Sequence, residues 1–392
     1  MTTATNIEAA KERARAAVDS AADELIRISR EIHSHPELAL QEHHAFAQLV
    51  PFLEERGFAM QTGVYDMETA FRGEWGHGPT TIAICAEYDA LPEIGHACGH
   101  NLIATAGIGA AAGLIAAIDP ADARVVILGT PAEEMYGGKC VMVNKGCFDD
   151  IDVAMMAHPM AVDFADPPML GVAHVDIEYN GKAVHASVGP EQGVNALDAI
   201  VSAYQAVAQL RQHIRRDARL HGIITYGGAA ANIVPDRTTG TFYVRAMTPR
   251  YLTELKERVR HCFEAGALST GCTLTMDWHE DLEYQPLRNN GPMVEAYRRN
   301  GEAVGKQFVD IKNVSTGSTD MGNVSQVVPS IHPTFGVGQM IFNHTPDFTA
   351  AAVTDAAHAS MLKTAQALAM TGIDLALDPQ LVKRAKAEFA GR

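Results

Sequence analysis

The sequence predicts an α/β protein with a mainly parallel sheet between helices and a smaller α+β domain inserted into that layer. The chain has 392 residues, which is enough for two domains of ordinary size. Apolar runs typical of buried strands alternate with helical runs until about residue 171, where half-exposed, alternating strands take over. The first pattern returns from about residue 290. We therefore expect one domain from residues 1–172 and 289–392, with residues 173–288 inserted.

Helices and buried strands alternate along the first domain. Residues 6–35 have the apolar spacing of one long amphipathic helix, and a second helix is expected over 42–57. Two strand-like runs follow within 66–90, and the second of them (TTIAICAEYDA) has the apolar centre of a strand covered on both faces. The remaining expected elements are strands at 124–130 (RVVILGT) and 152–158 (DVAMMAH) and a helix near 351–369.

The run from Gly99 to Ile118 contains no Asp, Glu, Lys or Arg, and its length would suit a membrane span. It consists mostly of Ala and Gly and also holds polar residues, so a helix packed in the core is favoured. Gly107, Gly109 and Gly113 come close to a dinucleotide-binding fingerprint, which has to open a helix directly after a strand. Because a helical run already precedes Gly107, these glycines indicate close helix packing instead.

The inserted segment has its own order of elements. Its predicted strands and helices run β-α-β-β-α-β, which suits a small ferredoxin-like α+β domain. The two helices are the amphipathic runs ALDAIVSAYQAVAQLRQHI (196–214) and YLTELKERVRHCFEAGAL (251–268). The half-exposed strands are HVDIEYNGKAVHAS, HGIITYGG, TGTFYVRAM and CTLTMDWHED.

The composition excludes several classes of partner. Lys and Arg number 31 and Asp and Glu 47, which gives a net charge of −16. This negative charge argues against nucleic acid or an anionic membrane as a partner, and a substrate with a carboxylate would need a local cation. Six Cys are too few for a disulfide scaffold, and residues 1–30 lack the apolar segment of an export signal. We therefore expect a cytoplasmic protein with free thiols.

Three metal-binding residue types lie close together in His96-Ala-Cys98-Gly-His100. In a helix, Cys98 and His100 would point about 200° apart, whereas in an extended or turn segment they would share a side. We therefore expect them just before the helix that follows, with Asn101 as its cap. A buried Cys and two polar turn His are the alternative.

Further candidate ligands follow neighbouring strands. Pro131-Ala-Glu133-Glu134 comes directly after RVVILGT, and its adjacent Glu side chains diverge, so that one can bind metal while the other faces water. A solvated helix N-terminus is the alternative. His158 follows DVAMMA and His344 lies late in the chain, and a lone His is more often structural. Because the ends of parallel strands meet in one crevice, the set could hold two ions.

These motifs, in this order, resemble the di-metal aminoacylase and carboxypeptidase family, metallopeptidase family M20. Two stretches, AEYDALPEIGHACGHN (86–101) and GSTDMGNVSQVVP, are most similar to the p-aminobenzoyl-glutamate hydrolases and the β-alanyl-lysine dipeptidases. The resemblance covers almost the whole chain. Other matching stretches are IHSHPELALQEH (32–43), GTPAEEMYGGK (129–139), MMAHP (155–159), GKAVHAS (181–187), GVNALDAI (193–200), HGIITYGGAAANIVPD (221–236) and NHTPDF (343–348).

The resemblance implies a role for each side chain of the centre. Glu133 becomes the general base, and Asp89 orients a ligand, with a charge capping a strand end as the alternative for Asp89. The better-known family variant has a His-x-Asp pair whose His binds a metal, but here that stretch reads Glu87-Tyr88-Asp89, so this ligand is missing. The cofactors would be two divalent ions, Zn²⁺ or Mn²⁺, with Co²⁺ as a further candidate. Their implied ligands are Cys98, His100, Glu134, His158 and His344.

The inserted domain resembles the family's lid and dimerisation domain, which implies a homodimer. There His185 resembles the lid His that hydrogen-bonds the reacting carbonyl oxygen, commonly in the partner subunit. Asn232 and Arg245 resemble the pair that holds the substrate carboxylate, for which the Arg fork is suited, and an exposed strand charge is the alternative for Arg245. The same pocket would be lined by Gly317, Ser318 and Thr319.

The reaction implied is metal-dependent hydrolysis of the amide bond in N-acyl amino acids or dipeptide-like conjugates with a free carboxylate. Two ions would share a water and lower its pKa, Glu133 would accept its proton, and the resulting bridging hydroxide would attack the amide carbonyl. Two alternatives stay open. One is a dipeptidase or carboxypeptidase that acts on true peptides, and the other is a non-catalytic metal-binding homologue.

Overall fold

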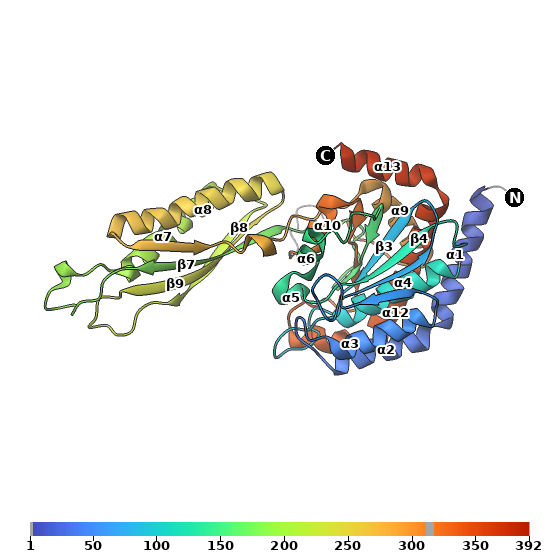
Figure 1. Ribbon diagram of the computed structural model, residues 1–392, viewed down its shortest axis with the longest axis horizontal. Coiled ribbons are helices and arrows are strands. Elements are labelled where there is room, and N and C mark those ends of the chain that lie inside the picture. Colours follow the sequence, from blue (N-terminus) through green and yellow to red (C-terminus); the bar gives the residue numbers. More distant parts are fainter. Residues whose placement is uncertain (1–2, 311–316, 392) are drawn as a thin grey trace. The chain divides into compact units, whose positions relative to one another are not determined.

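The computed structural model describes residues 3–310 and 317–391, which form two compact units (Figure 1). The first unit comprises the residues up to Pro167, the segment from Arg288 to Asp310 and the residues from Asn323 onward. The second comprises Pro168–Leu287 together with residues 317–322. Within the second unit, Leu170 N donates to Gly317 O at 3.1 Å, so residues 317–322 pack with it although the predicted boundaries assign them to the first domain.

A six-stranded sheet forms the centre of the first unit. Its strand order is β1-β2-β4-β3-β5-β11, and β4, β3, β5 and β11 run parallel, which confirms the mainly parallel α/β layer. Strand β2 pairs antiparallel with β4 and with the edge strand β1, and β1 was not expected from the sequence. The strands are β1 (Ala59–Thr62), β2 (Phe71–Gly76), β3 (Thr81–Ala86), β4 (Arg124–Gly129), β5 (Val153–Met155) and β11 (Ser330–Ile331).

Helix α4 (His100–Ile115) packs on β3 and β4 and is itself covered by α12 (Asp355–Leu377), α1 (Thr3–Ser20) and α2 (Ala22–Ser34) (Figure 1). The prediction of a single helix over 6–35 is wrong, because the helix is interrupted at Ala21. Helix α1 packs against α12, whereas α2 packs against α3 and α4. The other elements of this unit are α3 (His43–Glu54), α5 (Glu133–Tyr136), α6 (Gly138–Asn144), β6 (His158–Met160), α9 (Gly291–Ala303), β12 (Thr334–Gly336), α11 (Pro346–Ala351) and α13 (Pro379–Ala390), with α10 (Met321–Val327) at the boundary.

The Ala- and Gly-rich run forms α4, which is buried along almost its whole length. Among the described residues, no helix has the length and apolar content needed to cross a bilayer. A Cβ at Gly107 would lie 3.0 Å from Cys85 O, so this glycine lets the helix approach β3 closely. The predicted cap is wrong, because α4 begins at His100 and the Asn101 amide instead donates to Ser29 Oγ and Ala352 O, each at 3.0 Å.

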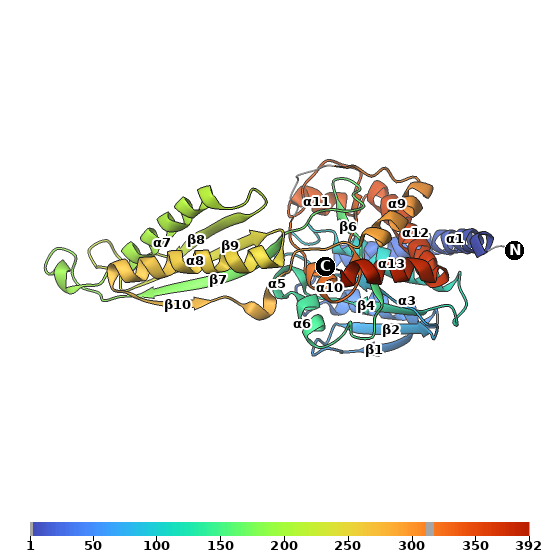
Figure 2. The same ribbon diagram turned by 90° about the horizontal axis from the view of Figure 1, so that it is seen from above.

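The second unit is a four-stranded antiparallel sheet with both helices on one face (Figure 2). The elements follow the predicted β-α-β-β-α-β order, and the strand order β10-β7-β9-β8 is that of a ferredoxin-like domain. Edge strand β8 exposes apolar side chains, among them Ile223, which is 64% exposed. The elements are β7 (Gly171–Asn180), α7 (Ala196–Leu210), β8 (Arg219–Tyr226), β9 (Arg237–Ala246), α8 (Pro249–Thr270) and β10 (Thr273–Asp277).

A buried carboxyl group in the first unit makes stability depend on pH. Glu42 is fully buried and accepts hydrogen bonds from Leu40 N at 2.9 Å and Thr69 Oγ1 at 2.7 Å. Burial outweighs these bonds and raises the pKa of Glu42 from 4.5 to about 7. A raised carboxyl pKa stabilises the fold below the unfolded pKa, and this stabilisation is lost as the pH rises through the folded pKa.

We therefore expect the free energy of unfolding to fall by about 1–3 kcal/mol between pH 4.5 and about 7 because Glu42 ionises. Urea denaturation at pH 5 and pH 8 measures this loss, and Glu42→Gln should reduce it. Equal pH dependence in the variant and the wild type would contradict the assignment.

Candidate metal centre

The candidate ligands of the first unit lie where its strands end. Glu133 and Glu134 follow β4 and open α5, and His158 opens β6 shortly after β5. Cys98 and His100 flank the start of α4, because His100 is the first residue of that helix and Cys98 lies two residues before it. Since β3, β4 and β5 are parallel, these strand ends meet at one edge of the sheet.

The five predicted ligands form overlapping groups of three. Cys98, His100 and His158 bring ligand atoms within 4.8 Å of one another, and so do Cys98, Glu134 and His344. Cys98 Sγ lies 3.4 Å from His158 Nε2, and Glu134 Oε1 lies 3.4 Å from His344 Nε2. Two ligands of one tetrahedral ion with bonds of about 2.0–2.2 Å are about 3.3–3.6 Å apart. The spacing therefore fits metal coordination.

Glycine is required at the turn between the two ligands of the first motif. Gly99 has a φ of 77°, and a Cβ there would lie 2.6 Å from Pro159 Cγ. Ala132, just before Glu133, also has a positive φ of 65°, an uncommon conformation for a residue with a side chain. His344 is a second such residue, with φ 63°. Positive φ values thus recur beside the candidate ligands.

Hydrogen bonds orient the imidazoles. His100 Nδ1 lies 2.9 Å from Asp89 Oδ1, and His158 Nδ1 lies 2.8 Å from the carbonyl oxygen of Pro159. In each ring the Nε2 atom is therefore the one directed at the centre. Asp89 also accepts from Glu134 N at 2.9 Å through its other oxygen, so one carboxylate links two predicted ligands.

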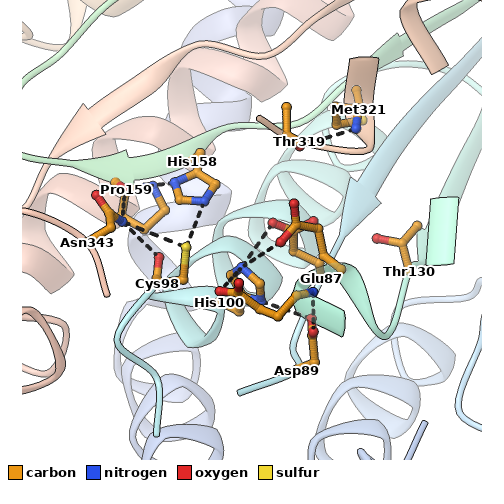
Figure 3. A network of polar contacts seen from close by, with 12 residues as sticks. Glu87, Asp89, Cys98, His100, Thr130, His158, Pro159, Thr319, Met321 and Asn343 are labelled. Atoms are coloured by element: carbon orange, nitrogen blue, oxygen red, sulfur yellow. Dashed lines mark hydrogen bonds and ion pairs between the residues drawn. The ribbon is translucent and has the colours of Figure 1, made fainter. Parts of the chain in front are cut away.

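The charges of the centre are suited to a cation. His100 Nε2 lies within 4 Å of carboxylate oxygens of Glu87, Glu133 and Glu134. Figure 3 shows the Glu87 side chain beside this imidazole. Burial lowers the pKa of His100, but Glu87 and Asp89 outweigh burial and raise it well above 6.5. The carboxylates around this imidazole therefore favour a positive charge at the centre. His100 Nε2 and Glu134 Oε1 are buried without a hydrogen bond among the described residues, so both are open to an ion.

Two further side chains match the needs of metal ligands. Burial lowers the pKa of His158 to about 4, so this imidazole is neutral near pH 7, as a ligand must be. Burial, followed by the Glu134 charge, raises the pKa of the Cys98 thiol well above 9. A divalent cation at this thiol would be needed to keep it as a thiolate.

Sequence reasoning missed several residues beside the centre. Lys139 Nζ donates to Glu87 Oε2 at 2.5 Å, and both residues are fully buried. The ring of His332 lies 5.8 Å from that of His158, centroid to centroid. Asn343 Nδ2 donates to Pro159 O at 3.1 Å and ties the loop of His344 to β6. The sequence offered one signal for these residues, because Lys139 is a charged residue among the apolar residues of α6.

The other predicted site residues lie in the second unit. His185 and Asn232 are exposed on adjacent segments, where Ala186 N donates to Asn232 O at 2.9 Å. Arg245 Nη1 donates to Ser318 Oγ at 2.7 Å, and its Nε donates to His221 Nε2 at 3.3 Å. No described carboxylate forms an ion pair with Arg245, although this side chain is half-buried. Gly317 is exposed and Thr319 is buried.

Comparison with known proteins decides the family. The sequence profile of Peptidase family M20/M25/M40 matches residues 83–367. The chain belongs to this family. It is therefore an enzyme of a class whose members hydrolyse amide bonds, and the resemblance found in the sequence is confirmed.

Relatives of this M20 protein span nearly its whole length. A mouse Xaa-Arg dipeptidase is 42% identical over 98% of this chain and 93% of its own length. One of the subunits of p-aminobenzoyl-glutamate hydrolase from Escherichia coli is 28% identical over 92% of this chain and 91% of its own. Both agree with the subgroup to which the sequence motifs pointed.

Solved structures share the fold of this M20 protein. A putative aminohydrolase from Staphylococcus aureus has a TM-score of 0.77 at 21% identity, covering 93% of this chain and 99% of its own. A dinuclear metal-binding M20 peptidase from Bacillus subtilis has a TM-score of 0.70 at 21% identity, covering 91% and 99%. The α/β architecture with its inserted domain is therefore that of known family members.

Proposed function

We propose that this protein is a di-metal amidohydrolase that cleaves dipeptide-like amides whose amine half is an amino acid with a free carboxylate. The observation that carries this proposal is the convergence of Cys98, His100, Glu134, His158 and His344 beside Glu133. The ligands would hold Zn²⁺ or Mn²⁺, with Co²⁺ as a further candidate, because a thiolate favours zinc while carboxylate and imidazole also accept the other two. The first unit would be the catalytic domain.

The chain supplies the groups that move protons and hold the substrate. Two divalent ions at this centre would lower the pKa of a water toward neutrality. Glu133 would accept the proton of this water and later donate it to the leaving amine. Asp89 would keep His100 and Glu134 in position through its two oxygens. Arg245, which has no described carboxylate partner, would bind the substrate carboxylate together with Asn232.

The names of the relatives support one substrate class over another. The mouse and human Xaa-Arg dipeptidases are 42% and 40% identical to this chain, whereas the relatives named for acyl amino acids are 28% identical or less. We therefore expect dipeptides with a C-terminal Arg to be cleaved faster than N-acyl amino acids, which are the second candidate.

A matched substrate series tests this proposal. Initial rates would be measured with metal-loaded enzyme on Gly-Arg, β-alanyl-Arg, Gly-Glu, N-acetyl-Arg and p-aminobenzoyl-Glu. Fastest cleavage of the Arg dipeptides supports the dipeptidase function. Fastest cleavage of the acyl compounds supports the second candidate, and no cleavage of any compound contradicts the amidohydrolase function.

We further propose that the second unit is a lid and dimerisation domain. Exposed apolar side chains on edge strand β8, including Ile223 and Tyr226, would be covered in a homodimer. Light scattering of the purified chain checks the dimer.

A cytoplasmic location is supported by the six Cys, all of which are free thiols.

Mixing two inactive variants tests whether His185 acts across such a dimer. His185→Ala should keep its fold and its metals but lose about 10²–10³ in rate, because an oxyanion donor is gone. Mixing it with Glu133→Gln should restore part of the activity, since one site of a mixed dimer would be intact. His213→Ala, an exposed His in the same unit, is the control and should stay active. Absence of recovery after subunit exchange would place His185 and Glu133 in the same chain.

A further inference from the structure

A buried ion pair lies beside the centre and has no part in the reaction described above. Glu87 follows β3 and Lys139 lies in α6, and both side chains have no exposed surface. Lys139 Nζ donates to Glu87 Oε2 at 2.5 Å. Removing an ammonium and a carboxylate from water costs several kcal/mol per ion, and the mutual attraction recovers this cost only with good geometry and further partners. A contribution to stability alone therefore does not explain why this ion pair is buried.

The second oxygen of Glu87 is directed at the centre. Glu87 Oε1 lies 3.4 Å from His100 Nε2 (Figure 3). Both atoms are buried, and neither makes a hydrogen bond within the part of the chain that the structure describes. Because Asp89 engages Nδ1 of His100, Nε2 is the nitrogen left for an ion. Glu87 Oε1 and His100 Nε2 are thus two neighbouring candidate ligand atoms that no described hydrogen bond occupies.

The separation of these two atoms is that of two ligands on one ion. It equals the 3.4 Å of the Cys98–His158 and Glu134–His344 pairs, and it falls within the about 3.3–3.6 Å of a tetrahedral site. Among the carboxylate oxygens near His100 Nε2, Glu87 Oε1 is closer than Glu134 Oε1 at 3.8 Å and Glu133 Oε2 at 3.9 Å. Glu87 therefore has the better geometry for an ion on this nitrogen.

We propose that Glu87 is a ligand, through Oε1, of the ion that His100 binds, and that Lys139 positions it by holding Oε2. The inference rests on the proposed function in so far as that function places ions at this centre. Lys139 balances the charge of Glu87, so the ion gains a ligand while the net charge of the pair stays near zero.

Ion binding tests this inference without relying on activity. The double variant Glu87→Gln/Lys139→Met keeps the shapes of the pair and removes both charges. Its ions per chain and its dissociation constants for Zn²⁺ and Mn²⁺ would be measured by dialysis and chelator competition. One ion should bind as in the wild type, while the other should bind at least about 10–100-fold more weakly. The visible absorption of the Co²⁺ form should change for one ion only.

A second Lys–carboxylate pair supplies the matched control. Lys306 Nζ lies 3.1 Å from Asp163 Oδ1 in the same unit; Lys306 is buried, and the Asp163 side chain is 18% exposed. Asp163→Asn/Lys306→Met therefore removes a comparable pair and should leave both dissociation constants unchanged. Weakening of ion binding in this control as well as in the test variant would attribute the effect to lost stability and overturn the inference.

A conservative variant keeps the inference testable if the double variant does not fold. Glu87→Asp retains the charge and the Lys139 partner but shortens the side chain by one methylene, so the affinity for the same ion should fall about tenfold or more. Wild-type affinity and an unchanged Co²⁺ spectrum in Glu87→Asp would overturn the inference. Two ions bound equally well with and without Glu87 contradict this inference alone, whereas a wild type that binds no ion contradicts the proposed function as well.

Discussion

Glu133→Gln should bind two divalent ions as the wild type does and lose amide hydrolysis by about 10²–10⁴-fold or more. The amide keeps the shape of the side chain but cannot accept the proton of a water at neutral pH. Glu133 is buried beside the centre, with Oε2 3.9 Å from His100 Nε2, and it lies on α5 next to the predicted ligand Glu134. The measurement is kcat/KM on the best substrate, together with the metal content of the same preparation.

Glu134→Gln is the informative comparison, because the same substitution one residue later removes a predicted ligand instead of the base. We expect Glu134→Gln to lose metal as well as activity, and Glu133→Gln to lose activity alone. Full activity in a metal-loaded Glu133→Gln preparation would show that another group accepts the proton.

Cys98→Ala should weaken the binding of both ions by at least about 100-fold and abolish hydrolysis with them. The thiol belongs to both groups of three ligands, one with His100 and His158 and the other with Glu134 and His344. Its loss therefore removes a ligand from each group, whereas loss of His158 or His344 affects only one. Dialysis against Zn²⁺ followed by elemental analysis measures the remaining ions.

The matched control is Cys262→Ala, the same substitution on α8 of the second unit. Cys262 Sγ donates to Arg258 O at 3.4 Å and lies in none of the candidate ligand groups of the described chain. This variant should bind both ions normally. Retention of two tightly bound ions by Cys98→Ala would remove the thiol from the ligand set.

The overall architecture was predictable from the sequence because strand and helix periodicities are local. The alternating strands and amphipathic helices of the inserted segment predicted its β-α-β-β-α-β order, which the structure confirms. The gathering of Cys98, Glu134 and His158 followed from the rule that the ends of parallel strands share an edge. The break at Ala21 was not predictable, because the apolar spacing continues through it and packing on α3, α4 and α12 decides it.

Details of the centre depended on contacts between distant segments and could not be read from one stretch of sequence. Asn101 follows the pattern of a helix cap, yet Gly99 turns the chain earlier, and the amide of Asn101 is used to join α2 to the segment after α11. The pairing of Glu87 with Lys139 joins residues on different elements, so the apolar surroundings of Lys139 in the sequence do not reveal that Glu87 is its partner.

The proposed function requires that five side chains from separate segments hold two divalent ions beside Glu133. It is tested most directly by a crystal structure of the enzyme grown with Zn²⁺ or Mn²⁺, using the anomalous scattering of the metal. We expect two peaks, each within about 2.0–2.3 Å of ligand atoms from the set Cys98, His100, Glu134, His158 and His344. A fully active enzyme with no peak among these residues, or with its ions bound elsewhere, would contradict it.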